Sequence, residues 1–173
     1  MLVVCTGNTC RSPLVAGWLL HLLPDDFSVS SAGLLGWGEQ PATAHSISVA
    51  ERSGVSLTGH RSRRLDPAMV NRADLVLAMT RQHAWGVAAR DGTAAARTFL
   101  LPEAVRRGRA TGPRGSQSLR TWSESLGTGR DHRHPGRPDD ELADPAGQPI
   151  EAYETLAGRV EPLVLALAEL LAG

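Results

Sequence analysis

The sequence predicts an α/β fold in which an open, four-stranded parallel sheet carries helices on both faces of a single domain. The chain has 173 residues, of which 42% are apolar, and this suits one domain with a sizeable core. Short apolar runs alternate along the chain with segments whose apolar residues recur at helical spacing. This alternation is typical of parallel sheets, because each helix returns the chain to the edge where the next strand starts.

Four segments are predicted strands. Leu2–Val4 is a short, buried, β-branched run, and Phe27–Ser31 leads into Ser-Ala-Gly. Ala73–Met79 is another buried strand, and Arg97–Leu101 is the fourth. Each is followed by a turn or a helix signal, so the four are expected to lie in one sheet.

Four helices are predicted between and after these strands. Residues suited to helix ends mark them, since proline favours a first turn, a hydroxyl residue an N-cap and glycine a stop. Pro162 lies inside the last helix, where we expect a kink. The predicted ranges are residues 12–23, 43–52, 80–90 and 149–171.

Residues 103–143 interrupt this alternation. The segment is rich in Arg, Gly, Ser, Asp and Pro and offers few apolar residues to a core. Such composition favours disorder, so we expect a flexible insertion within the 1–173 domain. A basic flap that attracts a phosphorylated partner is the alternative interpretation. Within the segment, the stretch SLRTWSESL predicts a short helix.

Composition and charge exclude several kinds of function. The formal net charge is zero, so we expect no nucleic-acid partner and no membrane partner. Every basic residue is arginine, and a chain without lysine cannot form the Walker A loop of a standard P-loop NTPase. The longest apolar stretch, residues 163–172, is too short to span a bilayer. With only two cysteines and no signal peptide ahead of the first strand, we expect a cytoplasmic location.

The stretch CTGNTCRS, residues 5–12, lies between the first predicted strand and the first predicted helix. A glycine-containing turn in this place directs backbone N–H groups inward as an anion-binding nest, and the helix N-terminus adds partial positive charge. These charges and the Arg11 guanidinium favour the thiolate form of Cys5. The pattern therefore predicts that Cys5 attacks phosphorus while the nest and the Arg11 fork hold the three equatorial oxygens.

Two further side chains of this stretch have predicted roles. Ser12 can donate a hydrogen bond to the Cys5 sulfur and make it a better leaving group, and Asn8 can tie the loop to its neighbours. A bare C-x5-R occurs often by chance, but C-x-G-N-x-C-R-S-P between a strand and a helix is specific. A structural cysteine or a zinc site is a weaker interpretation, since C-x4-C supplies only two ligands.

These motifs resemble those of the low-molecular-weight protein tyrosine phosphatases. The resemblance covers most of the chain, because Ser31-Ala32-Gly33, the stretch 73–79 and Asp144-Pro145 all fall in the family's order. It implies a phosphorylated protein as partner, no metal and no other cofactor, and it leaves the oligomeric state open. It also implies that the loop around the nucleophile binds phosphate through Thr6, Gly7, Asn8, Thr9, Cys10 and Ser12.

The resemblance further implies a general acid in an Asp-Pro loop, which is Asp144 in this chain. The chemistry independently requires an acid, because Cys5 cannot protonate the leaving oxygen or nitrogen. Asp139, Asp140 and Glu141 lie nearby, but only Asp144 precedes a proline. After the phosphoryl group has been transferred to Cys5, the same carboxylate would activate the water that hydrolyses the intermediate.

Two departures from the family pattern leave the substrate open. Tyrosine-specific members follow Asp-Pro with aromatic residues, whereas here Pro145 is followed by Ala146 and Gly147. Thr9 stands where those members carry an aliphatic residue and where the phosphoarginine branch of the family carries threonine. Trp37 lies where the family often places a cleft aromatic, and it either stacks on the substrate or packs within its loop. Phosphotyrosine is the expected substrate, and phosphoarginine is the alternative.

Other interpretations stay open. Arsenate reductases share this loop, but no cysteine follows Cys10 to carry a disulfide outward, so that activity would need a small-molecule thiol. A non-enzymatic phosphoprotein-binding module would have no use for Cys5 as a nucleophile or for Asp144 as an acid. Cys10 either captures an oxidised Cys5 as a reversible disulfide or only packs under the loop.

Overall fold

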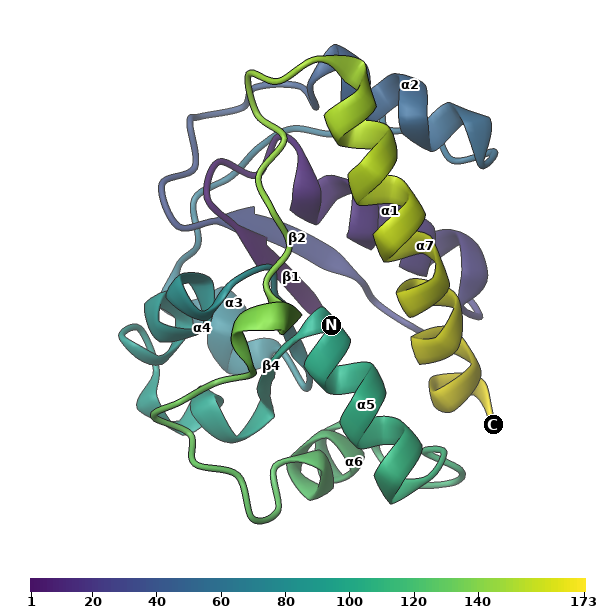
Figure 1. The fold of residues 1–173 in the computed structure, drawn as a ribbon. Coiled ribbons are helices and arrows are strands. Elements are labelled where there is room, and N and C mark those ends of the chain that lie inside the picture. Colours follow the sequence, from purple (N-terminus) through teal and green to yellow (C-terminus); the bar gives the residue numbers. More distant parts are fainter.

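Four parallel strands form one open sheet in the order β2-β1-β3-β4 (Figure 1). The computed structural model describes residues 1–173. The strands are β1 (Leu2–Cys5), β2 (Ser30–Gly33), β3 (Val76–Ala78) and β4 (Thr98–Leu100). The prediction of a four-stranded parallel sheet in a single α/β domain is therefore confirmed.

All four strands differ in extent from the predicted ranges: β1 runs one residue further, to Cys5, and neighbouring turns and helices take residues from the other three. Phe27 belongs to a turn closed by its N–H and the Pro24 carbonyl, at 3.0 Å, so β2 starts later. Ala73 ends a helix that the sequence did not predict, which shortens β3. Arg97 lies in a 3-10 turn, and Leu101 already begins a helix, which shortens β4 at both ends.

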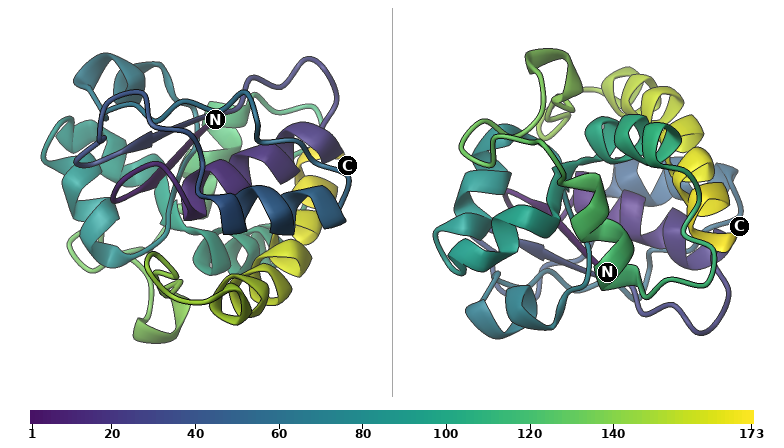
Figure 2. Two further views of the ribbon diagram at one scale, coloured as in Figure 1. Left: turned by 90° about the horizontal axis from the view of Figure 1, so that it is seen from above. Right: turned by 90° about the horizontal axis from the view of Figure 1, so that it is seen from below.

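Helices cover both faces of the sheet, as Figures 1 and 2 show. Helices α1, α5 and α7 pack together on one face, with α2 beside α1 and α7. Helices α3 and α4 lie on the other face. Their bounds are α1 (Arg11–Leu22), α2 (Ala44–Arg52), α3 (Pro67–Arg72), α4 (Arg81–Ala88), α5 (Leu101–Thr111), α6 (Leu119–Leu126) and α7 (Ile150–Ala172), with 3-10 turns η1 (Gly92–Arg97) and η2 (Pro138–Asp140).

Alternation along the strands divides the core into two layers. Side chains of successive strand residues point to opposite faces. Val3 and Leu77 belong to the larger cluster with α1, α5 and α7. Val4 and Val76 belong to the smaller cluster with Val87 of α4 and residues of α3. The strands are thus buried on both sides, which explains why they are continuous apolar runs.

Two helix starts follow the predicted capping residues, whereas α1 starts one residue earlier than predicted, at Arg11, and α4 ends two residues earlier, at Ala88. Thr43 accepts a hydrogen bond from Ser46 N at the start of α2, and Thr80 accepts one from His83 N at the start of α4. Helix α7 continues through Pro162 as a single element. None of these helices combines the length and the apolar character that crossing a membrane requires.

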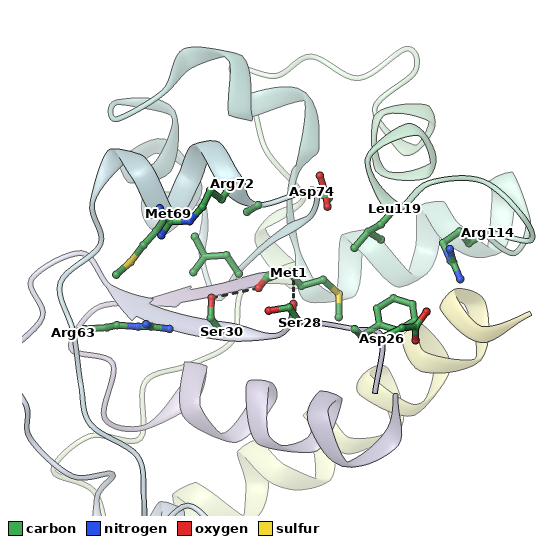
Figure 3. Close-up of a pocket in the computed structure, with 13 residues that line it drawn as sticks. Met1, Asp26, Ser28, Ser30, Arg63, Met69, Arg72, Asp74, Arg114 and Leu119 are labelled. Atoms are coloured by element: carbon green, nitrogen blue, oxygen red, sulfur yellow. Dashed lines mark hydrogen bonds between the residues drawn. The ribbon is translucent and has the colours of Figure 1, made fainter. Parts of the chain in front are cut away.

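A cavity of about 500 Å³ lies at the amino ends of the strands (Figure 3). Its wall includes Met1 and Leu2 of the first strand region, Asp74 before β3, and the side chains of Arg72 and Arg114. It contains no cysteine and none of the residues 5–12. In parallel α/β sheets, ligands bind at the opposite edge, outside the carboxyl ends of the strands.

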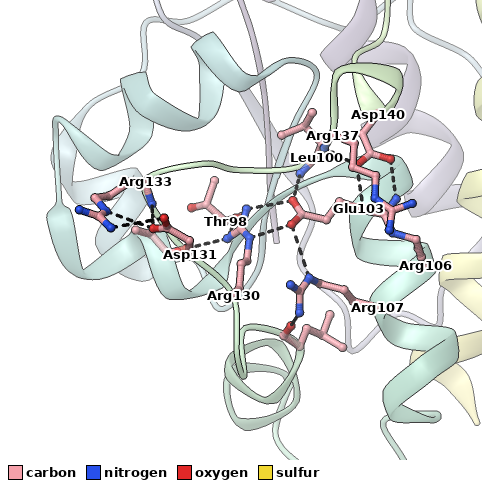
Figure 4. Close-up of polar contacts among 12 residues, drawn as sticks. Thr98, Leu100, Glu103, Arg106, Arg107, Arg130, Asp131, Arg133, Arg137 and Asp140 are labelled. Carbon is pink, nitrogen blue, oxygen red and sulfur yellow. Dashed lines mark hydrogen bonds and ion pairs between the residues drawn. The ribbon is translucent and has the colours of Figure 1, made fainter.

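Residues 103–143, expected from their composition to be a flexible insertion, contain most of α5 and all of α6, and they add to the core. Trp122 of α6, in the predicted short helix, is fully buried. Glu103 and Arg130, each 3% exposed, form a two-pronged ion pair with N–O distances of 2.7 and 2.9 Å (Figure 4). Arg130 also lies over the Phe99 ring at 4.6 Å. The expectation of few core residues is corrected, because this segment buries one aromatic ring and a paired charge.

Candidate active site

The loop of residues 6–10 joins the carboxyl end of β1 to the start of α1. The carbonyl groups of Cys5, at the end of β1, and of the loop are bound from outside: Leu34 N donates to Cys5 O at 2.9 Å, and Leu35 N donates to Thr6 O at 3.0 Å. Thr43 N donates to Thr9 O at 2.9 Å. With carbonyl groups engaged outward, the loop has the arrangement of an anion-binding nest at a helix N-terminus.

Asn8 holds the loop in shape from its centre. Its backbone has a φ of 59°, in the left-handed region, which asparagine tolerates better than most residues. Its amide nitrogen donates to Ser12 Oγ and to Ser31 Oγ, both at 2.9 Å. Its amide oxygen accepts from Arg63 N at 3.0 Å. The predicted contacts of Asn8 with neighbouring elements are present, and they link the loop to β2.

Gly33, at the end of β2, allows that strand to approach the loop closely. A Cβ atom at this position would lie 2.6 Å from Thr6 O and 2.9 Å from Asn8 N, which is closer than real Cβ contacts. Only glycine therefore fits, which gives the Ser-Ala-Gly motif a steric reason.

Cys5 lies at the base of the loop and is 2% exposed. Its sulfur is 2.9 Å from Ser12 Oγ and 3.3 Å from Asn8 N, which donates to it. Because Ser12 Oγ accepts the Asn8 amide, its own proton is free to be donated to the sulfur. Two donors aimed at one sulfur stabilise negative charge there.

Arg11 begins α1, and its side chain is 4% exposed. Nη1 donates to Leu142 O at 3.1 Å, and Nη2 donates to Thr6 Oγ1 at 3.3 Å. Nε is buried and has no hydrogen-bond partner. A buried donor without a partner is costly, and an anion in the loop would supply the missing acceptor.

Asp144 is brought to this guanidinium from the far end of the chain. Its carboxylate forms an ion pair with Nη2 of Arg11, while its side chain remains 42% exposed. Leu142, two residues earlier, is anchored by its N–H to Met79 O at 2.9 Å. The Asp-Pro loop therefore lies against the nucleophile loop and the end of β3.

An open cleft of about 410 Å³ lies above the loop, at the carboxyl ends of β1 and β3. This is where a parallel sheet of this order changes winding direction, the usual ligand position in such folds. Seven of its nine lining residues are polar or charged. The lining residues are Thr6, Arg11, Thr80, Gln82, His83, Glu141, Leu142, Ala143 and Asp144.

His83 is a site residue that the sequence analysis missed. It is 2% exposed, and its Nε2 lies 2.9 Å from Thr6 Oγ1 while its Nδ1 lies 2.9 Å from Thr80 Oγ1. Burial and the nearby Arg11 guanidinium lower the pKa of His83 to about 4, so the imidazole is neutral at pH 7. The available signal was its position one turn after a capped helix start that follows a buried strand.

Trp37 lies over the outer surface of the loop. A Cβ atom on Gly7 would be 2.7 Å from its ring, so the indole packs directly on that glycine. The side chain is 55% exposed, although it is large and apolar. It is therefore both packed against the loop and available at the rim, and both interpretations of Trp37 remain compatible with its place.

The side chains of Cys10 and Thr9 lie close to each other under the loop, and the Cys10 sulfur also lies near two hydroxyl groups. The Cys10 sulfur lies 3.5 Å from Thr43 Oγ1 and 3.6 Å from the Tyr153 hydroxyl. Thr9 Oγ1 lies 3.9 Å from the same sulfur, and Thr9 is buried. Both cysteines are free thiols. No group of three or more His, Cys, Asp or Glu side chains comes together in a way that would hold a metal.

This fold and this loop together are typical of the cysteine-dependent phosphatases. The profile described as "Low molecular weight phosphotyrosine protein phosphatase" matches residues 1–111. The chain belongs to the low-molecular-weight phosphotyrosine protein phosphatase family, whose members are hydrolases with a cysteine nucleophile in the phosphate loop.

Similar proteins include one named as a tyrosine phosphatase and one named as an arginine phosphatase. The chain is 47% identical over 83 residues to the low-molecular-weight protein-tyrosine-phosphatase Etp of Escherichia coli. These residues make up 48% of this chain and 55% of that protein. The match therefore spans only about half of the length of that relative. It is 32% identical over 169 residues to a protein-arginine-phosphatase of Geobacillus stearothermophilus, covering 98% of this chain and 93% of that protein.

Solved structures show the same architecture. The YwlE arginine phosphatase from Geobacillus stearothermophilus matches with a TM-score of 0.74 at 31% identity, covering 97% of this chain and 89% of that chain. The Erwinia amylovora tyrosine phosphatase amsI matches with a TM-score of 0.76 at 26% identity, covering 99% and 92%.

Proposed function

We propose that this protein is a protein phosphatase that hydrolyses phosphotyrosine through a phosphocysteine intermediate on Cys5. The observation that carries the proposal is the sulfur that accepts hydrogen bonds from Ser12 and Asn8 at the base of an anion-binding loop. The partner is a phosphorylated protein, and no metal or other cofactor takes part. We also propose a cytoplasmic location, because a thiolate nucleophile requires a reducing compartment and both cysteines are free.

The first step transfers the phosphoryl group to sulfur. The Cys5 thiolate attacks phosphorus, and the bond between phosphorus and the leaving oxygen breaks. Arg11 Nε, now without a partner, and the loop N–H groups hold the equatorial oxygens. Asp144 gives its proton to the leaving oxygen, which departs as a neutral hydroxyl.

The second step releases inorganic phosphate. The Asp144 carboxylate takes a proton from a water molecule, and the water oxygen attacks phosphorus as the bond to sulfur breaks. Ser12 donates its hydrogen bond to the departing sulfur, so Cys5 leaves as a stabilised thiolate. The protonated Asp144 is then ready for the next substrate.

Phosphoarginine is the second candidate substrate, and three observations support it. Thr9 replaces an aliphatic residue, Ala146 and Gly147 rather than aromatic residues follow Pro145 directly, and the cleft wall contains only one ring, that of His83. The relative that matches over nearly the whole chain is a protein-arginine-phosphatase. A flexible guanidino chain needs no aromatic wall, whereas a phenyl ring without one loses stacking contacts of about 0.5–1.5 kcal/mol each.

Three experiments test the proposal. Turnover of p-nitrophenyl phosphate should be lost in Cys5→Ser, because a serine hydroxyl is not ionised near neutral pH; a wild-type protein that binds phosphate but does not turn over would instead be a binding module. Side-by-side kcat/KM values on phosphotyrosine and phosphoarginine peptides then decide the substrate. Thr9→Ile should lower kcat/KM on phosphoarginine more than on phosphotyrosine, and an equal loss would make Thr9 a packing residue only.

A further inference from the structure

His83 is a buried imidazole with both ring nitrogens engaged. Nδ1 lies 2.9 Å from Thr80 Oγ1, and Nε2 lies 2.9 Å from Thr6 Oγ1. Thr80 belongs to the segment after β3, and Thr6 belongs to the loop after β1. The imidazole thus bridges the two loops that border the cleft, across 77 residues of sequence.

The bridge continues to the guanidinium. Thr6 Oγ1 accepts a hydrogen bond from Arg11 Nη2 at 3.3 Å, because an arginine can only donate. Thr6 Oγ1 therefore has two partners, His83 Nε2 on one side and Arg11 on the other. A hydroxyl that is free to rotate would not hold a fixed orientation, but one fixed by a buried ring is a defined acceptor for the guanidinium.

Arg11 requires such an acceptor because Asp144, the other partner of its Nη2 atom, must leave the guanidinium during the reaction. Nη2 contacts both Thr6 and Asp144, and Asp144 must turn toward the leaving group to protonate it. When Asp144 leaves, Thr6 is the protein partner that remains at Nη2, and Leu142 O is the one at Nη1. The orientation of the guanidinium then depends on the hydroxyl that His83 holds.

We propose that His83 is a positioning residue, whose Nε2 fixes the Thr6 hydroxyl so that it holds the Arg11 guanidinium ready for the phosphoryl group. The inference rests on the proposed phosphatase function only for its effect on kcat/KM. Its direct effect is that His83 raises the affinity of the loop for a phosphate dianion.

Two variants of His83 separate positioning from packing. Asparagine reaches only as far as Nδ1, so His83→Asn can keep the contact with Thr80 and loses the contact with Thr6. Glutamine reaches as far as Nε2, so His83→Gln can restore a partner for Thr6. Inorganic phosphate binding, measured by titration calorimetry, should weaken about tenfold in His83→Asn, the equivalent of about 1.4 kcal/mol, and stay within about threefold of wild type in His83→Gln.

Variants of Thr6 test the same link without touching the histidine. Thr6→Val should weaken phosphate binding as His83→Asn does, and Thr6→Ser, which keeps the hydroxyl, should not. Because one hydrogen-bonded chain is interrupted in either case, the Thr6→Val/His83→Asn double variant should lose no more than the worse single variant. Multiplying losses, or equal phosphate affinities of the asparagine and glutamine variants, would overturn the proposal.

Measurements of turnover distinguish this inference from the phosphatase function on which it rests. If wild type turns over phosphate esters, kcat/KM should fall in His83→Asn in parallel with phosphate affinity. If wild type shows no turnover, the phosphatase proposal fails while the phosphate titration still decides the role of His83. Thermal unfolding of each variant identifies any that fails to fold, and the Thr6 pair then carries the test.

Discussion

Arg11 and Asp144 form an ion pair at the mouth of the cleft although they are 133 residues apart in the chain. The guanidinium proposed to bind the phosphoryl group thus neutralises the carboxylate proposed to act as the acid while the loop is empty. An arriving dianion competes with Asp144 for the guanidinium and releases the carboxylate, which takes up a proton from solvent and then lies beside the leaving group as the acid. The ion pair is therefore a resting arrangement that substrate binding itself disrupts.

Removing the carboxylate should slow the chemistry in a way that depends on the leaving group. Asp144→Ala should lower kcat by about 10²–10⁴ on a poor leaving group such as phenyl phosphate. The loss should be smaller on p-nitrophenyl phosphate, whose leaving oxygen needs less help from a proton. Steady-state kinetics on both esters check this, and an unchanged kcat on the poor leaving group would show that another residue is the acid.

Adding one methyl group to Gly33 should damage the loop. The new Cβ in Gly33→Ala would overlap Thr6 O and Asn8 N, so β2 or the loop must shift. We expect a loss of about 1–3 kcal/mol of unfolding free energy in urea, together with weaker phosphate binding. Gly59→Ala is the matched control, because nothing lies within 4 Å of a Cβ there. Equal stability of the two variants would contradict the steric argument.

The buried Glu103–Arg130 pair should be costly to break on one side only. Arg130→Met leaves the Glu103 carboxylate in the core with only the longer ion pair to Arg107, at 3.5 Å, and should cost about 3–5 kcal/mol of unfolding free energy. Replacing both residues, as in Glu103→Leu/Arg130→Met, removes the buried charge and should recover a large part of that loss. Urea denaturation of the two single variants and the double variant gives the coupling energy. An additive double variant would show that the pair is not coupled.

Stability should fall in mild acid because of His83. Its pKa is about 4 in the folded protein, lowered by burial and by Arg11 and partly offset by Glu141, against about 6.5 in an unfolded chain. The unfolded state therefore binds more protons between these values, and stability decreases as pH falls from about 6.5 to about 4. The gap corresponds to roughly 3 kcal/mol. His83→Gln should flatten this part of a stability–pH curve measured by urea denaturation; an unchanged slope would assign the acid sensitivity to other groups.

Cys10 should protect Cys5 if the two thiols can meet after oxidation. Peroxide converts a reactive thiolate to a sulfenic acid, which a second thiol condenses to a disulfide with loss of water. Wild-type protein inactivated by peroxide should regain activity with dithiothreitol, and Cys10→Ser should not. Cys10 is buried beside Thr43 and Tyr153, so equal recovery in the two proteins would indicate that it only packs under the loop.

Local patterns in the sequence determined most of the architecture and the core of the candidate site. Hydrophobic runs and helical spacing predicted four strands and four of the helices, because these signals depend on near neighbours in the chain. The CTGNTCRS stretch predicted the loop between β1 and α1 in the same way. The contacts predicted for Asn8 and Ser12 lie within or next to that loop, so short-range reasoning reached them.

Only the tertiary structure decided the features that depend on distant segments. The bridge from His83 to Thr6 exists because β1 and β3 are neighbours in the sheet, which no local pattern specifies. The exact ends of the strands were set by turns and helices competing for the same residues. The segment 103–143 gained a place in the core because the charge of Arg130 is compensated by Glu103, a partner 27 residues away. From composition alone, a charged residue is expected at the surface. Only the fold brings up the opposite charge that makes its burial possible.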